Sequence, residues 1–340
     1  MTGIRLQPRE HARHARAFVV RWRARLSARA CGLALLYHGV AEATGDPDEI
    51  LPAQAATTLE AQVRHLRRHY RLVPASELLE ATRSRRRGQR IPVALTFDDD
   101  LRSHVTHAAP LLRRIDAPAA FFLCGASLTG PRRFWWEDLQ VVLDSRALLP
   151  DALPGIRSEM VGAALAGKER AAKRLAAEIE QLTPTARADV ASVLRTVAGD
   201  AGPEAGLRGS EARFLADRAF EVGFHTLHHD RLSELGDDEL EAAFVDGRAE
   251  LEAAVGRALT SVSYPHGSAD ERVAAAARAA GFRWGFGGGE GAVAADDDPL
   301  LLPRVAATAD SPGAFALEVA RFTSGRQTHA LEPRRAQVGA

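Results

Sequence analysis

The chain of 340 residues contains only two cysteines, Cys31 and Cys124, which lie far apart in the sequence. This excludes a disulfide-rich scaffold and a zinc site built from cysteines. No apolar run approaches the roughly 20 residues that a membrane-spanning helix needs. Arginines also interrupt every apolar window near the N-terminus that could form the core of a secretory signal. We therefore expect a cytoplasmic protein in which histidines and carboxylates hold any metal ion.

Lysine is equally rare, because Lys168 and Lys173 are the only two and 42 of the 44 basic residues are arginines. The 44 acidic residues balance this charge, so the composition gives no evidence for nucleic-acid binding. Hydrophobic residues make up 46% of the chain and charged residues 26%, which excludes a disordered or collagen-like chain. The composition indicates a globular protein with a sizeable core.

The first 30 residues form a basic segment in which repeated arginines face a single acid, Glu10. Phe18, Trp22 and Leu26 recur at four-residue intervals, which predicts an amphipathic helix. Its cationic face would suit an anionic membrane surface, so a peripheral membrane contact is one interpretation. The other is a helix that simply packs on the domain.

Short apolar runs alternate with helical patterns from residue 32 onward. The predicted strands cover residues 32–38, 92–97, 119–123, 221–224, 262–264, 282–286 and 300–305. Strands that alternate with helices predict a parallel sheet with helices outside, either an open doubly wound sheet or a barrel. About seven repeats with polar residues at the strand ends favour a distorted (β/α) barrel. One long helix is predicted for residues 237–255.

A helical insertion interrupts this alternation. It contains Trp135 and Trp136, a charged helix over residues 169–181, and a helix start signal at Thr183-Pro184. We therefore expect an N-terminal helical arm at 1–30, a barrel at 31–310 with the insertion at about 132–212, and a C-terminal helix and polar tail at 311–340.

Three acids, Asp98, Asp99 and Asp100, follow the strand that ends at Phe97. Clustered carboxylates raise one another's pKa unless a cation neutralises them, so the cluster indicates a metal site. A solvated turn that caps the next helix is the alternative.

A second polar segment, His225-Thr226-Leu227-His228-His229, also follows a predicted strand. Residues four apart share a face in a helical turn, so His225 and His229 can bind one ion while His228 points elsewhere. A hydrogen-bonded surface turn is the alternative. A third strand end, residues 263–267, contains a Pro-His-Gly turn that could aim a backbone N–H inward.

Together these segments resemble the polysaccharide deacetylase family, carbohydrate esterases that remove N-acetyl groups from chitin-like and other amino-sugar substrates. The family's Thr-Phe-Asp-Asp-Gly motif matches Thr96 to Asp99, and its His-(Ser/Thr)-x-x-His motif matches His225 to His229. Further matches are Tyr37 to Val40, the strand at 119–123, Trp135 to Glu137, and Tyr264 to Gly267. The resemblance covers about residues 33 to 306.

The resemblance implies a distorted (β/α) barrel with a divalent metal ion, usually zinc. It makes Asp99, His225 and His229 the metal ligands and Asp98 the general base, with the backbone N–H of His266 stabilising the oxyanion. The implied partner is an N-acetylated carbohydrate.

Three departures from the family pattern bear on the remaining residues. Asp100 replaces the motif's glycine, no arginine precedes Pro265, and the C-terminal Leu-x-x-His motif that supplies the acid is not found. We expect Arg304 to place a guanidinium near Asp98 instead, and the His266 side chain to act as the acid. The expected substrate-binding residues are His38, Tyr264, Pro265, Arg304 and Trp135.

Two other functions remain open at this stage. A barrel without the acid could bind a glycan without hydrolysing it, or the site could cleave another amide or an O-acyl sugar. The identity of the sugar, the metal in the cell and the oligomeric state are not determined by the sequence.

Overall fold

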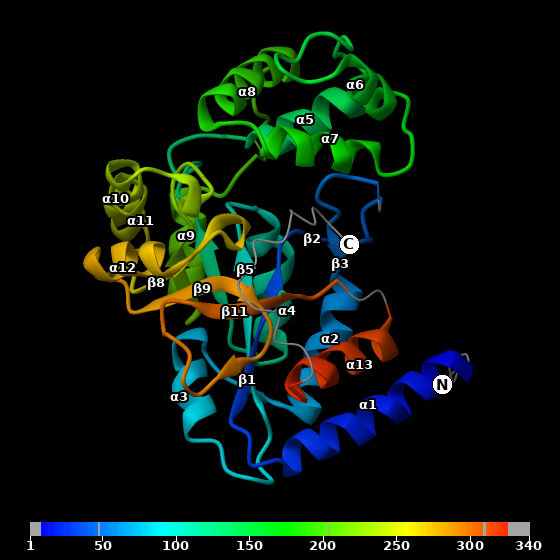
Figure 1. The fold of residues 1–340 in the computed structure, drawn as a ribbon, viewed down its shortest axis with the longest axis vertical. Coiled ribbons are helices and arrows are strands. Elements are labelled where there is room, and N and C mark those ends of the chain that lie inside the picture. The colour runs from blue at the N-terminus through cyan, green and yellow to red at the C-terminus, as the bar shows by residue number, and fades with distance from the viewer. Residues whose placement is uncertain (1–7, 47, 204, 309–310, 326–340) are drawn as a thin grey trace.

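The computed structural model describes residues 8–46, 48–203, 205–308 and 311–325 (Figure 1). Within these ranges, seven parallel strands close into a barrel in the order β1-β11-β9-β8-β7-β6-β5, and β5 pairs back with β1. The strands are β1 Cys31–Tyr37, β5 Pro92–Asp98, β6 Ala120–Leu123, β7 Glu221–Phe224, β8 Ser261–Ser263, β9 Trp284–Glu290 and β11 Leu302–Ala306. The predicted (β/α) barrel is confirmed, and each predicted strand overlaps one barrel strand.

Four two-residue strands complete the sheets. They are β2 Val40–Ala41, β3 Gln54–Ala55, β4 Arg71–Leu72 and β10 Val293–Ala294. Strand β4 runs parallel to the start of β5, β10 runs antiparallel to β1, and β2 pairs with β3 apart from the barrel.

The barrel strands bury both faces, which is why they appear in the sequence as continuous apolar runs. Every residue of β5 is buried. The register then fixes where the polar residues emerge. Phe97 of β5 lies opposite Tyr37 of β1 and Phe121 of β6, so the residues that follow these strands leave the barrel at one edge.

Helices surround the barrel. They are α2 Ala56–His69, α3 Leu78–Arg83, α4 Ala109–Arg114, α9 Gly209–Asp217, α10 Asp237–Val245, α11 Arg248–Val255 and α12 Glu271–Ala279. Short helical turns lie at η1 Ala75–Glu77, η2 His104–Ala108, η3 Leu232–Glu234 and η4 Pro265–Gly267. The single helix predicted over 237–255 is wrong, because Gly247 adopts a left-handed conformation with φ of 73° that separates α10 from α11.

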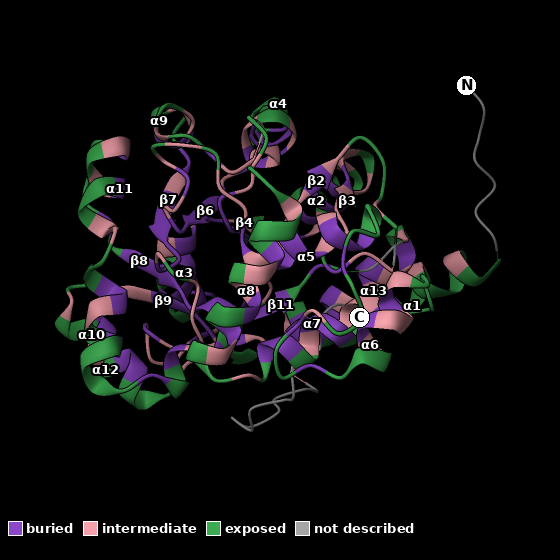
Figure 2. Cartoon of the chain, turned by 90° about the horizontal axis from the view of Figure 1, so that it is seen from above, coloured by how far each residue is buried: buried purple, intermediate pink, exposed green. Residues whose placement is uncertain are grey.

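Four further helices lie between β6 and α9 and cover the top of the barrel (Figures 1 and 2). They are α5 Trp135–Asp144, α6 Ser158–Leu165, α7 Ala171–Glu180 and α8 Pro184–Ala198. Their buried apolar side chains form a core separate from that of the barrel, which includes Leu139, Leu175 and Val190. The helices therefore form a compact layer above the strand ends.

Helix α1 (Pro8–Leu26) packs along α13 (Pro312–Thr323), at the opposite end of the molecule from this layer (Figure 1). None of the described helices combines the length and the apolar character needed to cross a bilayer. The predicted polar tail beyond residue 325 lies outside the described residues.

Candidate metal centre and active site

Asp99, His225 and His229 converge above the barrel at the ends of β5 and β7. The Nε2 atoms of His225 and His229 lie 3.5 Å and 3.4 Å from Oδ1 of Asp99. One ligand atom from each residue lies within 4.8 Å of the others. The three side chains therefore point at a common position.

The geometry around His225 leaves its Nε2 lone pair free. The carbonyl oxygen of Ser263 accepts a hydrogen bond from Nδ1 of His225 at 2.9 Å, which sets the tautomer. Burial lowers the pKa of His225 to about 4, so the ring is neutral at physiological pH. A neutral imidazole whose far nitrogen is held by a carbonyl is the form that binds a metal ion.

The three residues fit a divalent ion. Oδ1 of Asp99 is buried, and no residue that the structure describes donates a hydrogen bond to it. Two ligands of a tetrahedral zinc ion, each about 2.0–2.1 Å from it, are about 3.4 Å apart, close to the distances found here. Burial alone would raise the pKa of Asp99, but the neighbouring imidazoles, His229 foremost, hold it below its ordinary value. The donor set of one carboxylate and two imidazoles is one that zinc accepts.

Asp98 makes a bidentate ion pair with Arg304. Nη1 and Nη2 of Arg304 donate to Oδ1 and Oδ2 of Asp98 at 2.8 Å and 2.7 Å, and both side chains are buried. The hydroxyl of Ser263 donates to Oδ2 at 3.0 Å. Burial raises the pKa of Asp98, but the Arg304 guanidinium and then His225 lower it to about 2. Asp98 is therefore an ionised carboxylate beside the three candidate ligands.

Asp100, at the position of the family glycine, turns away from this centre. Its Oδ1 accepts hydrogen bonds from the backbone N–H groups of Cys124 and Gly125, at 2.8 Å and 3.1 Å. Its Oδ2 accepts from the backbone N–H and the hydroxyl of Ser127, at 3.3 Å and 3.2 Å. Asp100 therefore holds the loop that follows β6.

Four non-glycine residues around the centre adopt left-handed backbone conformations, with φ of 76° at Asp99, 55° at Thr226, 56° at His229 and 58° at His266. Such conformations are costly for residues with a Cβ and persist where surrounding structure enforces them. Their clustering marks this barrel edge as a functional site.

The side chain of His266 contacts both the candidate ligands and the helical layer. Its ring meets that of His229 edge to face, with centroids 4.6 Å apart. Its Nε2 lies 3.2 Å from Oε1 of Glu180, the last residue of α7. Burial and the neighbouring His229 lower the pKa of His266, whereas burial raises that of Glu180.

Aromatic residues at the start of α5 lie against His229, on the side of the helical layer. Trp136 stacks on Phe134 with ring centroids 4.5 Å apart, and its ring lies 4.6 Å from that of His229. Trp135 is half-buried and meets Trp136 edge to face. Burial raises the pKa of the adjacent Glu137 to about 7.

The structure brings only some of the expected substrate-binding residues to the centre. Arg304 lies on Asp98, and His38 follows β1 at the same edge and is half-buried. Tyr264 is fully buried, and its hydroxyl donates to the carbonyl of Leu300 at 2.7 Å. Its side chain therefore belongs to the core, and substrate binding by Tyr264 stays a prediction. Pro265, also buried, begins the η4 turn.

Sequence reasoning missed two contributions. Ser263 serves both Asp98, through its hydroxyl, and His225, through its carbonyl. Glu180 comes from an insertion helix, and nothing in its local sequence relates it to His266. A serine at the end of a buried strand needs a polar partner, and this rule could have identified Ser263 from the sequence.

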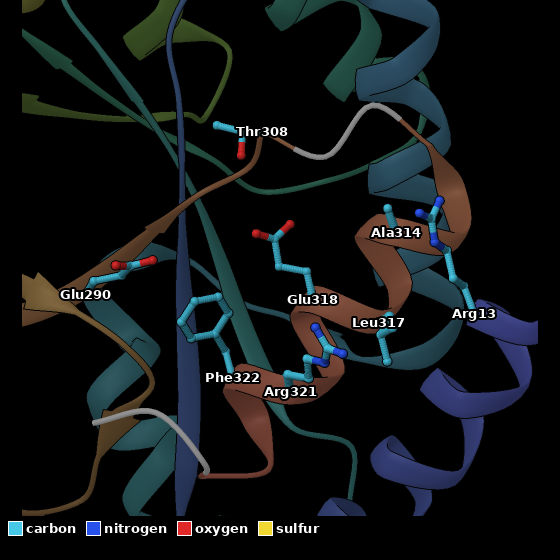
Figure 3. Close-up of a pocket in the computed structure, with 8 residues that line it drawn as sticks. All are labelled: Arg13, Glu290, Thr308, Ala314, Leu317, Glu318, Arg321 and Phe322. Atoms are coloured by element: carbon cyan, nitrogen blue, oxygen red, sulfur yellow. The ribbon is translucent and has the colours of Figure 1, made fainter. Parts of the chain in front are cut away.

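A separate cavity of about 450 Å³ lies beside α13 and contains none of these residues (Figure 3). Glu318 points into it, between Thr308 and Glu290. Its wall mixes both charges with apolar side chains.

Comparisons with known proteins agree with the motifs. Residues 194–285 match the family model for polysaccharide deacetylase. The resemblance to this family is confirmed. No curated protein sequence gives a significant match.

Several solved structures share the fold. The Streptococcus pyogenes deacetylase PplD, solved in complex with acetate, superposes with a TM-score of 0.53 at 15% identity, covering 82% of this chain and 92% of its own. IcaB from Ammonifex degensii superposes with a TM-score of 0.50 at 16% identity, covering 87% and 97%. The polysaccharide deacetylase BC0361 from Bacillus cereus gives 0.50 at 16% identity, covering 82% and 65%.

Proposed function

We propose that the protein is a metal-dependent carbohydrate deacetylase that hydrolyses the N-acetyl group of an amino-sugar substrate. The observation that carries this proposal is the convergence of Asp99, His225 and His229 beside an ionised Asp98. The polysaccharide deacetylase match and the shared fold support the choice of substrate class.

In this proposal three residues bind the metal ion and Asp98 acts as the base. Asp99, His225 and His229 would hold a divalent ion, most consistent with zinc. When bound, the ion would polarise the acyl carbonyl and lower the pKa of water toward about 7. Asp98 accepts the proton of the attacking water, because Arg304 and Ser263 hold its carboxylate in place.

The oxyanion and the leaving amine need separate partners. The backbone N–H of His266 stabilises the oxyanion in this proposal. Asp98 takes a proton from the attacking water and can return that proton to the leaving amine, so in this proposal we favour Asp98 over the His266 side chain as the donor.

The test combines metal content with acetate release from N-acetylated chito-oligosaccharides. Asp99→Ala, His225→Ala and His229→Ala should each lose most of the metal, whereas the exposed His228→Ala is the matched control and should keep both metal and activity. Asp98→Asn should keep the metal and lose on the order of 10² to 10⁴ in rate.

Two results would contradict the proposal. One is loss of the metal in His228→Ala with retention in His229→Ala. The other is near-normal acetate release by metal-loaded Asp98→Asn. Metal binding without turnover on any acetylated sugar, amide or ester would favour a glycan-binding barrel instead.

A further inference from the structure

Helix α1 carries an apolar stripe on the face that points away from the protein. Ala15, Val19, Trp22 and Leu26 recur at intervals of four, three and four residues, with Phe18 beside them, so they share one face. Phe18, Val19 and Trp22 are 58%, 44% and 55% exposed. Within the described ranges only seven large hydrophobic side chains are exposed, and three lie on this helix. The stripe is therefore a concentrated apolar surface.

The opposite face of α1 provides the docking contacts. Ala17, which is buried, packs with Ala316 and Ala320 of α13. The single acid of the helix, Glu10, accepts hydrogen bonds at 2.9 Å from the hydroxyl of Ser311 and the backbone N–H of Gly313. Small residues and the acid thus face the protein, and the large apolar residues face outward.

The rotation of α1 about its axis is fixed at its C-terminal end. The guanidinium of Arg85 donates to the carbonyls of Ala24, Arg25 and Arg29, at 3.1, 2.8 and 2.9 Å. These contacts satisfy carbonyl groups that the end of a helix leaves unpaired. Because the helix is held by both Arg85 and α13, the stripe cannot turn inward without breaking them.

Cationic side chains flank the stripe. Arg9, Arg16 and Arg23 recur at seven-residue intervals on one side of it, and all three are exposed. No described residue forms an ion pair with them. Arg25 lies on the other side, where its Nε donates to the carbonyl of Gly88. Since Glu10 faces α13, the outward face of α1 carries no acid.

We propose that α1 binds the surface of an anionic lipid bilayer. The stripe would enter the boundary between headgroups and acyl chains, and the flanking arginines would contact anionic headgroups. Charge argues against a second copy of the chain, because two such faces would bring like-charged arginines together. The apolar centre of the surface argues against nucleic acid, whose backbone contacts are made by polar and cationic groups.

The test is co-sedimentation of the full chain with two kinds of vesicle, pure phosphatidylcholine and an equal mixture of phosphatidylcholine and phosphatidylglycerol. Binding should occur only to the anionic vesicles, weaken with salt, and shift the fluorescence of Trp22 to the blue. Replacing Arg9, Arg16 and Arg23 by Gln should weaken binding on the order of 100-fold, at about fivefold per arginine. Trp22→Ser should weaken it on the order of tenfold.

Matched controls separate this surface from general charge and hydrophobicity. The triple change of the exposed Arg113, Arg146 and Arg283 to Gln, and Leu149→Ser, alter the same properties elsewhere and should leave binding unchanged. Vesicle binding is measured without any substrate, which keeps this test independent of the proposed function. All variants should also release acetate from a soluble substrate at the parent rate.

Four outcomes would overturn the proposal. They are equal binding to both kinds of vesicle, equal loss in the control variants, a dimer that Trp22→Ser dissociates, and binding of duplex DNA that Trp22→Ser leaves unchanged.

Discussion

Replacing Asp100 with glycine, the residue that the family motif has there, should destabilise this protein. The side chain is buried and accepts four hydrogen bonds, three from backbone N–H groups and one from a hydroxyl. Removal leaves the N–H groups of Cys124, Gly125 and Ser127 without acceptors, at a cost of roughly 1–3 kcal/mol each. Part of this is offset because burial of Asp100 is itself unfavourable, as its raised pKa indicates. We expect a net loss of about 3 kcal/mol.

Equilibrium unfolding in urea, with metal removed, measures this directly. Asp100→Asn keeps one acceptor oxygen for Cys124 and Gly125 and should lose only about 1 kcal/mol. Glycine offers no relief of backbone strain, because Asp100 is not among the residues with positive φ. Ser127→Ala, made alone and with Asp100→Gly, should show less than additive losses. An Asp100→Gly protein as stable as the parent would refute the assignment of Asp100 to the loop.

Two further predictions concern His65, which is partly buried, and Glu180, which is buried. Burial lowers the pKa of His65 from its ordinary 6.5 to about 3, so the unfolded chain binds a proton that the folded one does not, and stability falls as the pH drops below 6.5. His65→Leu should reduce the loss of unfolding free energy between pH 8 and pH 5 by about 2 kcal/mol, whereas the exposed His228→Leu should not, and an unchanged pH dependence would exclude this role. Glu180→Gln should lower kcat about tenfold with KM and metal content unchanged, because it weakens the contact that positions His266, whose backbone N–H stabilises the oxyanion in the proposed function. Glu178→Gln on the exposed side of the same helix is the control. An equal loss of kcat in that variant would show that the effect does not depend on the contact between Glu180 and His266.

The acid cluster and the histidine pair could be located from the sequence because their positions follow from local rules, whereas the resemblance was needed to choose Asp99 over Asp98 as the ligand. A buried strand is a short apolar run, and the residue after it must leave the barrel at the strand's end. Asp99 and His225 therefore converge once the parallel register is assumed. The left-handed conformations of Asp99 and His229 could not be predicted, because no glycine signals them.

The sequence did not show which side chain at the end of β8 points toward Asp98. Ser263 ends β8 and Tyr264 follows it in an extended conformation, so their side chains point to opposite faces. The motif favoured Tyr264 as the functional residue, whereas the structure buries its ring and points Ser263 at Asp98. Only the register of β8 against β9 settles which residue faces the barrel.

The sequence correctly predicted that α1 is amphipathic, but it did not show which face of the helix packs against the protein. Phe18 and Trp22 have the larger apolar surfaces, so they are the natural choice for burial. Ala17 and Ala24 instead face the protein, because small side chains let the helix approach closely. Which face packs depends on α13, nearly 300 residues away in the chain.

The helical layer contributes side chains that contact the candidate metal centre. The layer has a buried core of its own. It places Glu180 against His266 and Trp136 against His229. A barrel without the layer would keep Asp98, Asp99 and both candidate ligand histidines, but the carboxylate contact of His266 and the aromatic residues beside His229 would be lost. If the centre acts on a sugar, we therefore expect Glu180→Gln and Trp136→Ala to change kcat or KM without removing the metal, because these side chains reach the site from outside the shared motifs.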